Sequence, residues 1–407
     1  MRKNSALWTK DFTIITVGTV ISMFGNALSG FAISVLALDF SKSVFLYTLF
    51  MVAYSLPKVV MPILTGPVLD KHSRKKTIYC LDFTSCALYL GLYFYITFIG
   101  FSYPLFIVAA FLIGSIDSTY SVAYDSFYPN VIPEGFYRKA YSISSLIYTC
   151  SAVMVPVSIY VYEHVGIGVL FLFNSFSFLV AAIMETQIKT QEKHIEKEGI
   201  SERFWTRFRE GVKYLKGEKG LLYITIYSAV ALFAINGSLT ITMPYFRNGG
   251  PGIVSYMIIA GCGFLGRFVG GLFQYNHKYK AENRFAVAVT AYLVMCLADG
   301  IYLYFGVMIM AAIAFGVGIL RAMSDNLRIS STQDYVPDEV RARFNGAFLM
   351  FCTFGSVMGQ LSAGALADYF PIRGIVSAFM GLSLLTVIFC FVINRRHVGP
   401  IYNRALS

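Results

Sequence analysis

The dominant pattern in this sequence is a series of apolar segments separated by short polar breaks. A helix that crosses a lipid bilayer needs about 20 mostly apolar residues, and segments of that length recur along nearly the whole chain. The pattern therefore predicts twelve membrane-spanning helices. The expected spans are residues 12–38, 45–66, 77–99, 104–126, 138–161, 168–186, 221–243, 252–273, 284–305, 307–328, 344–368 and 374–394.

The composition excludes a soluble globular protein and argues against a nucleic-acid partner. Hydrophobic residues make up 57% of the chain and charged residues 14%, whereas soluble domains average about 45–50% and about 25%. The net charge of +11 alone would suit nucleic-acid binding. That function, however, requires basic residues gathered on one folded surface, whereas here they fall in alternate loops. The expected surroundings are a lipid bilayer.

The alternation of basic loops predicts how the chain is oriented in the membrane. Loops that remain on the cytoplasmic side carry an excess of lysine and arginine. The opposite loops contain only Lys42, Arg247 and Arg373. Both termini and the middle loop are therefore predicted to be cytoplasmic in a multi-pass protein of the cytoplasmic membrane. Apart from the middle loop, the basic residues on the predicted cytoplasmic side are Arg2, Lys3, Lys10, Lys71, Arg74, Lys75, Lys76, Arg138, Lys139, Lys278, Lys280, Arg284, Arg341, Arg343, Arg395 and Arg396.

The two halves of the chain align with each other at a constant offset of 204 residues. The segment GSIDSTYSVAYDSFYPNVIPEGFYRKA, from Gly114, matches GILRAMSDNLRISSTQDYVPDEVRARF, from Gly318. The same offset superimposes Gly66 on Gly270. Parallel repeats of this kind occur in transporters built from two helical bundles. We therefore predict an all-α membrane protein with six-helix halves at 1–186 and 221–407, joined by a linker at 187–220.

The second part of this linker has the pattern of an amphipathic helix. Within residues 201–219, apolar side chains recur at helical spacing at Phe204, Phe208, Val212 and Leu215, and basic side chains occupy the other faces. Such a helix can lie in the lipid headgroup region, or it can serve simply as a connection between the halves.

The loop after the second span carries a family motif. The sequence GPVLDKHSRKK, residues 66–76, resembles the signature between helices 2 and 3 of major facilitator transporters, with serine in place of the usual second glycine. The usual excess of positive charge in cytoplasmic loops explains Lys75 and Lys76 at the end of the motif, but it does not explain Gly66 together with Asp70. The resemblance implies a cytoplasmic gating latch, in which Asp70 meets the positive N-terminal end of helix 11 and Arg74 pairs with Asp125.

Further segments narrow the resemblance to one branch of that family. MVAYSLPKVVMPILTGPVLD, FLIGSIDSTYSVAYDSFYPNVIP and RFREGVKYLKGEKGL resemble the branch that holds enterobactin exporters, macrolide efflux pumps and the lysophospholipid transporter. This implies an organic, often amphiphilic substrate. The GPxxGG motif that is common in helix 5 of proton-coupled exporters is reduced here to Pro156, so helix 5 does not itself indicate antiport.

Glycines within the spans are expected to allow close helix packing. Helix 8 contains GCGFLG, residues 261–266, but a dinucleotide-binding reading needs a preceding strand and a soluble βαβ unit. Gly266 and Gly270 instead form a GxxxG packing face. Helix 11 carries Gly355, Gly359 and Gly364, for which we expect the same role.

Charged residues inside the spans are the main candidates for function. Each costs about 2.5–3.5 kcal/mol on insertion scales, so each requires a partner or a role. Asp117 and Arg321 lie near the middle of helices 4 and 10 at repeat-related positions. They are predicted to face each other across a central cavity, as a proton and substrate site or as a structural ion pair. Asp325 lies one turn beyond Arg321 and can neutralise it.

Other polar residues in the spans are weaker candidates. Lys58, Arg267 and Asp299 complete the charges near span centres, whereas Asp82, Asp125 and Glu185 lie near span ends and are expected to reach the interface. Asn26, Ser29, Asn236 and Ser238 are either cavity residues or interhelical hydrogen-bond partners.

These features together favour a secondary active transporter over an enzyme or a receptor. The seven cysteines form no CxxC pair and the five histidines lie outside the spans, so no metal site or cofactor is predicted. The expected function is proton-coupled efflux of a small amphiphilic compound by a monomer. The alternative is flipping or uptake of a lysophospholipid or another lipid. A membrane-embedded enzyme would need a nucleophile with its base inside the bilayer, and a static receptor would need no latch.

Overall fold

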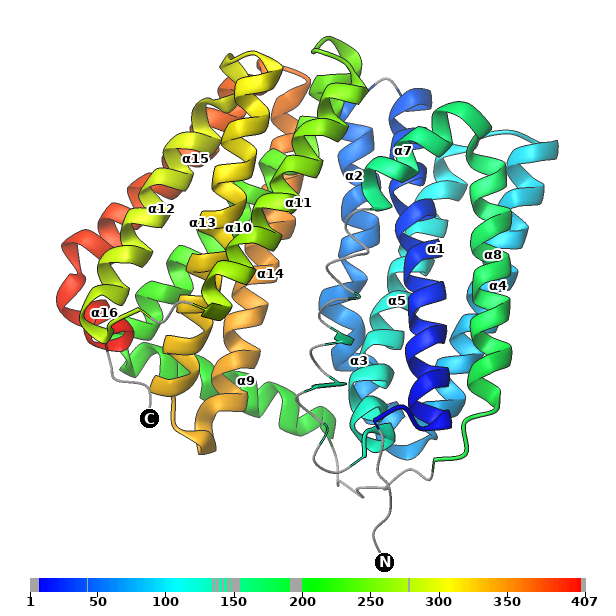
Figure 1. Cartoon of the computed structure of the whole chain (residues 1–407), viewed down its shortest axis with the longest axis horizontal. Helices are drawn as coiled ribbons and strands as arrows, with labels where there is room; N and C mark the ends of the chain where they lie inside the picture. Colours follow the sequence, from blue (N-terminus) through cyan, green and yellow to red (C-terminus); the bar gives the residue numbers. More distant parts are fainter. Residues whose placement is uncertain are drawn as a thin grey trace, which may run out of the picture. The chain divides into compact units, whose positions relative to one another are not determined.

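The computed structural model describes residues 7–41, 43–133, 136, 139–140, 143–144, 147, 154–190, 200–276 and 279–403. All regular elements in these ranges are helices (Figure 1). The α-helices are α1 (Lys10–Ser41), α2 (Val44–Ser55), α3 (Pro57–Lys71), α4 (Arg74–Phe98), α5 (Tyr103–Val131), α7 (Met154–Val165), α8 (Ile167–Thr186), α9 (Ile200–Gly217), α10 (Lys219–Asn248), α11 (Ile253–Asn276), α12 (Arg284–Ile301), α13 (Val307–Tyr335), α14 (Asp338–Ala367), α15 (Ile372–Val387) and α16 (Arg395–Tyr402).

Within the described residues, eleven helical segments are long and apolar enough to cross a membrane. Each corresponds to one of the predicted spans. The remaining predicted span, 138–161, falls mostly outside the described residues, and α7 begins near its end. The predicted all-helical fold is therefore confirmed.

The chain forms two compact units, which we call unit 1 and unit 2. Unit 1 comprises Met1–Lys42 and Ala53–Glu202, and unit 2 comprises Ser43–Val52 and Arg203–Ser407. In unit 1, α8 packs against both α4 and α1, while α5 packs against α3 and α4. In unit 2, α10 packs against α14 and α15, and α13 packs against α11 and α12.

The internal repeat is visible in the helix boundaries. Helix α5 runs from Tyr103 to Val131 and α13 from Val307 to Tyr335, so both helices have 29 residues and lie 204 positions apart. The repeat-related glycines of these helices also pack alike. A Cβ at Gly114 would meet the backbone carbonyl of Tyr54, and one at Gly318 would meet the backbone carbonyl of Gly263.

The predicted glycine packing faces are confirmed within unit 2. Gly266 and Gly270 lie against backbone carbonyls of α13, and Gly355 and Gly359 lie against backbone carbonyls of α10. Gly364 lies against Thr48, which belongs to unit 2 as part of residues 43–52. Because a hydrogen atom replaces the side chain at these positions, the helix backbones approach closely and gain dispersion contacts that do not depend on water.

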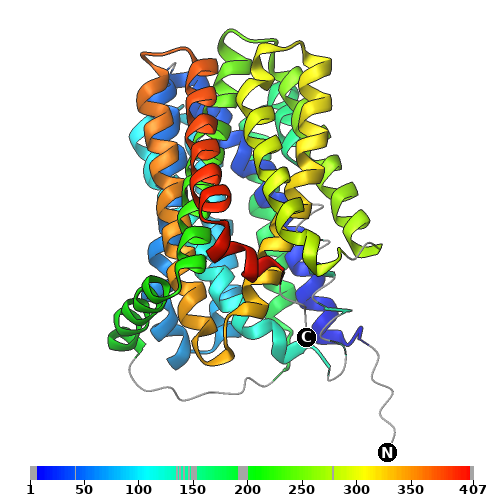
Figure 2. The ribbon, with the colours of Figure 1, turned by 90° about the vertical axis from the view of Figure 1, so that its left-hand side faces the viewer.

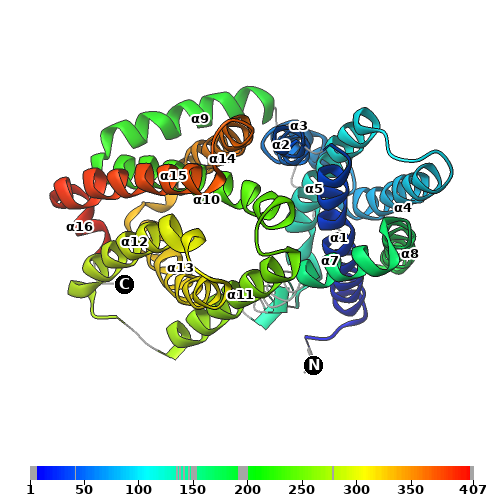
Figure 3. The same ribbon diagram turned by 90° about the horizontal axis from the view of Figure 1, so that it is seen from above.

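Two helices of unit 2 do not follow the direction of the spanning helices. Helix α15 continues through a π-helical segment, Ile388–Ile393, into α16, which turns aside from the spanning direction (Figure 2). Helix α9 lies across the direction of the spanning helices (Figure 3). Its residues Phe208, Val212 and Leu215 pack on the core of unit 2, and Glu210 forms an ion pair with Arg343 at 3.1 Å. The apolar face predicted for this linker helix therefore covers protein.

The second predicted span is divided by a proline. Helix α2 ends at Ser55 and α3 begins at Pro57, with Leu56 between them. Proline lacks the N–H that would continue the helical hydrogen bonds and its ring clashes with the preceding turn. The division falls beside Gly114, whose missing side chain admits the Tyr54 carbonyl. It therefore sets the positions of Tyr54 and Lys58 relative to α5.

The start of α2 has a capping partner on α14. The Asp368 carboxylate, just after the last residue of α14, accepts hydrogen bonds from the Val44 backbone N–H at 3.2 Å and the Ser43 hydroxyl at 3.0 Å. A carboxylate at a helix N-terminus satisfies a backbone donor and interacts favourably with the helix dipole. This contact joins the start of residues 43–52 to the rest of unit 2.

Candidate functional site

Unit 1 contains a cavity of about 570 Å³ that is lined by polar and apolar side chains. The cavity wall is formed by α1, α3, α4, α5 and α8, together with the end of α2. The apolar part includes Met23, Ile116 and Phe178. The polar part includes Asn26, Tyr54, Lys58, Asp82, Asp117 and Tyr120. A mixed wall of this kind suits an organic molecule that has both apolar and polar parts.

Asp117 forms the centre of the polar part of this wall. Its Oδ1 accepts a hydrogen bond from Asn26 Nδ2 at 2.9 Å, and its Oδ2 accepts one from the Tyr54 hydroxyl at 2.7 Å. The Tyr89 hydroxyl in turn donates to Asn26 Oδ1 at 3.0 Å. Hydrogen bonds to an ionised acceptor are about twice as strong as neutral ones. The carboxylate is thus held in place by side chains from α1 and α2 and is braced from α4.

A cation accompanies this carboxylate in the cavity. Lys58 Nζ lies 4.2 Å from the centroid of the Tyr54 ring, the same ring whose hydroxyl donates to Asp117. A cation over a tyrosine face is attracted by the ring quadrupole. Asn26, Lys58 and Asp117, three residues predicted from the sequence as separate candidates, therefore share one cavity.

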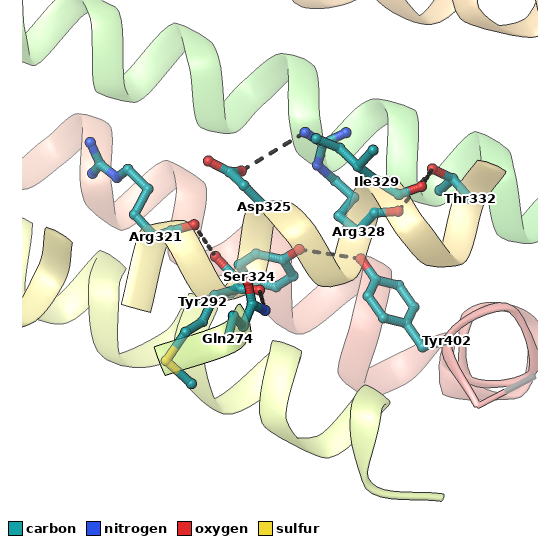
Figure 4. A network of polar contacts seen from close by, with 10 residues as sticks. Gln274, Tyr292, Arg321, Ser324, Asp325, Arg328, Ile329, Thr332 and Tyr402 are labelled. Carbon is teal, nitrogen blue, oxygen red and sulfur yellow. Dashed lines mark hydrogen bonds and ion pairs between the residues drawn. The ribbon is translucent and has the colours of Figure 1, made fainter. Parts of the chain in front are cut away.

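Unit 2 contains a second group of charges, and here the local prediction was wrong. Arg321 Nη2 lies 2.6 Å from Asp299 Oδ2 on α12, with both side chains largely buried. Asp325 instead forms an ion pair with Arg328 at 3.8 Å (Figure 4). Asp325 was expected to neutralise Arg321 because it lies one turn away, but an acid on the neighbouring helix makes the shorter contact.

The charges that were expected to face each other have separate partners. Asp117 is bound by Asn26 and Tyr54 within unit 1, and Arg321 is bound by Asp299 within unit 2. The predicted pairing of Asp117 with Arg321 therefore remains a proposal.

Two acids that were expected to reach the membrane interface are buried instead. Asp82 is 1% exposed and Glu185 is 0% exposed. The Tyr120 hydroxyl donates to Glu185 Oε1 at 3.3 Å. Asp125, by contrast, is exposed as expected for a residue near a span end.

A signal for this burial was present in the sequence. On α4, Asp82 lies on the same helical stripe as Ile78, Ser85 and Tyr89, all of which are buried. Residues spaced by three and four positions share one face of a helix. Distance from the span end suggested the interface, but this periodicity indicated the protein interior.

The residues predicted to form a latch lie at the end of α3, the start of α4 and on α5, and their role as a latch remains a prediction. Gly66 and Asp70 fall on α3, and the surroundings of Gly66 and the side chain of Asp70 are outside what the structure describes. Arg74 begins α4, and its Nη1 donates to the backbone carbonyl of Ser126 at 3.3 Å, next to Asp125 in sequence. Ser73, the departure from the family motif, caps α4 by accepting a hydrogen bond from the Lys76 N–H.

The remaining polar candidates have mainly interhelical or local roles. Ser29 accepts a hydrogen bond from Asn174 Nδ2 at 2.6 Å, which joins α1 to α8. Asn236 is half-buried on α10, where its backbone carbonyl accepts a hydrogen bond from Thr240. Ser238, also on α10, is buried. Ser29 is therefore an interhelical hydrogen-bond partner, which was one of the two predicted roles.

Comparison with known proteins identifies a family and a relative with similar sequences. The sequence profile described as Major Facilitator Superfamily matches residues 15–320. The uncharacterized MFS-type transporter YkuC from Bacillus subtilis (strain 168) is 23% identical over 248 residues, which cover 58% of this chain and 56% of YkuC. The chain thus matches little more than half the length of this curated relative.

A solved structure shares the fold. The crystal structure of a mutant of the nucleoside transporter NupG superimposes with a TM-score of 0.64 and 14% sequence identity. The superposition covers 94% of this chain and 98% of the NupG chain. At this identity the likeness concerns the fold alone.

Proposed function

Because this chain belongs to the Major Facilitator Superfamily, we propose that it is a proton-coupled secondary transporter that exports a small amphiphilic organic compound. The proposed location is the cytoplasmic membrane, with both termini cytoplasmic and a monomer as the working unit. The loop charges support that orientation. The substrate and protons are its proposed ligands.

The observation that carries this proposal is the position of Asp117 in the cavity of unit 1. An acid inside a membrane-spanning helix is costly, and such residues mark ion and substrate pathways. Asp117 lines a cavity that also has an apolar wall, and hydrogen-bond donors hold both of its oxygens. This arrangement can exchange a proton for the polar group of a substrate.

The roles of the other residues follow from their charges. Lys58 supplies a cation next to Asp117, and Asn26 and Tyr54 orient the carboxylate. Arg321 keeps its charge at any physiological pH. We propose it as the fixed cation of the second half, available to Asp117 or to an anionic substrate group in another state of the transport cycle. Asn236 is proposed as a further polar contact on that half, and Gly66, Asp70, Arg74 and Asp125 as the gating latch.

The proposal is tested by Asp117→Asn in proteoliposomes with an imposed pH gradient and ethidium as the amphiphilic substrate. Asparagine retains the shape and the hydrogen-bond acceptor but cannot ionise. We expect proton-driven ethidium transport to be lost while the purified variant stays monodisperse. Glu282→Gln, an exposed change in the short 3₁₀ turn Ala281–Asn283 before α12, serves as the matched control and should transport normally. Undiminished proton-driven transport by Asp117→Asn would refute the assignment.

A second candidate function is lipid translocation, favoured by the charges of unit 2. Among the residues that the structure describes, Arg267, Arg321 and Arg328 interact there with two acids, Asp299 and Asp325. An excess positive charge in a span favours an anionic headgroup. Thermal unfolding with lysophosphatidylglycerol or ethidium discriminates the two, since a ligand of the native state raises its stability in proportion to RT ln(1 + [L]/Kd). Stabilisation by the lipid alone would favour the second candidate.

A further inference from the structure

Asp82 and Glu185 form a pair of buried acids that the proposed transport site does not use. They come from α4 and α8, which pack side by side in unit 1. Their exposed fractions are 1% and 0%, and the two carboxyl groups are near enough for a charge on Glu185 to repel a charge on Asp82. The pair is built into the helix interface, because Gly18 on α1 leaves room for it: an added Cβ there would lie 3.2 Å from Glu185 Oε1.

A hydrogen bond within this pair requires a proton. An ionised carboxylate only accepts hydrogen bonds, so the two carboxyl groups can bond to each other only when one of them carries a proton. Both oxygens of Asp82, and Oε2 of Glu185, receive no hydrogen bond from any donor group among the described residues. Isolated buried charges without partners are strongly unfavourable. Binding of one proton turns two repelling anions into one hydrogen-bonded pair.

The groups that face the pair offer no positive charge instead. From α5, Tyr120 donates to Glu185, and Asp117 acts on Asp82 as a like charge. Tyr124, also on α5, stacks on Tyr120. From α1, Gly18 and Thr19 face the pair and its Tyr120 partner without a charge. In the part of the chain that the structure describes, neither acid has an ion pair with lysine, arginine or histidine.

The pair is in contact with the cavity of the proposed site. Asp82 and Tyr120 both line that cavity, and Tyr120 lies three residues from Asp117 on the same face of α5. Asp82 and Tyr120 are therefore the side chains through which a proton from the cavity would reach the pair. Because the charge on Asp117 repels a charge on Asp82, a proton leaving one site favours proton retention at the other.

We propose that Asp82 and Glu185 form a second proton-binding site, which is filled from the cavity and is electrostatically coupled to Asp117. The coupling part rests on the proposed function of Asp117, whereas proton binding by the pair does not. A pump or carrier that moves protons commonly uses several carboxyl groups in series within its spans. The pair would then retain a proton while Asp117 is occupied by substrate.

The experiment is infrared difference spectroscopy of the full chain in liposomes, with the proton itself as ligand. The wild type should show the C=O stretch of a protonated carboxylic acid in buffer alkaline enough to ionise exposed carboxyl groups. This band should shift in D₂O. Asp82→Asn and Glu185→Gln should each remove it, whereas Glu282→Gln should leave it unchanged and Asp117→Asn should leave the component of the pair in place.

The outcomes separate this site from the transport proposal and from a structural role. Absence of the band in the wild type, or its persistence in both pair variants, would overturn the proposal even if a variant is poorly folded. If the band behaves as expected but Asp117→Asn transports normally, the proton site stands and the proposed function fails. If the pair were purely structural, Asp82→Asn would still transport ethidium in response to the pH gradient, because the asparagine amide can donate to Glu185. We expect instead that ethidium transport by Asp82→Asn no longer depends on the pH gradient.

Discussion

Replacement of Asp299 by alanine should cause a large loss of stability, because it strands a buried arginine. The Arg321 guanidinium lies 2.6 Å from the Asp299 carboxylate, and the two side chains are only 16% and 19% exposed. Removing one partner of a buried ion pair costs about 3–5 kcal/mol, because the other charge remains without compensation. The residual exposure favours the lower end, so we expect about 3 kcal/mol, which is a change of about 100-fold in the unfolding equilibrium.

The assay is equilibrium unfolding of the purified protein in mixed micelles titrated with SDS. A double variant, Asp299→Leu with Arg321→Met, removes both charges and should recover most of the wild-type stability, since neutral residues of similar volume are often tolerated in place of a buried pair. A single-variant loss below about 1 kcal/mol, the value of an exposed pair, would refute the reasoning. So would a double variant that is no more stable than Asp299→Ala.

Three further predictions follow from the packing, the capping and the latch. Gly114→Ala should lower the unfolding free energy by about 1–3 kcal/mol and reduce transport, because the added Cβ meets the Tyr54 carbonyl. Gly91→Ala is the control, since its Cβ meets nothing within 4 Å, and it should be neutral or stabilising in the same SDS unfolding assay. Ser73→Ala should lose about 0.5–2 kcal/mol through the missing cap of α4, whereas Ser73→Gly should lose only a few tenths, so equal losses in thermal unfolding would contradict the capping role. Asp70→Asn should slow ethidium transport without altering folding, and normal turnover in proteoliposomes would show that the motif is only topological.

The sequence alone determined the helices and their repeat. Length and apolarity of a span are local properties, because a helix satisfies its own backbone hydrogen bonds and the bilayer selects about 20 apolar residues. The offset of 204 residues predicted that α5 and α13 are equivalent, and both helices begin and end at that spacing. The packing role of Gly266 and Gly270 was also predictable, since small residues four apart form one flat face of a helix.

The partners of the buried charges were decided by the tertiary structure. Sequence spacing identifies neighbours on the same helix, which is why Asp325 was expected to neutralise Arg321. The observed partner, Asp299, lies on another helix, and its reach depends on how α12 is rotated and placed against α13. Likewise Asp82 and Glu185 are 103 positions apart in the chain and meet only because α4 and α8 pack together. Helix rotation and packing arise from many side-chain contacts at once, so no local pattern specifies them.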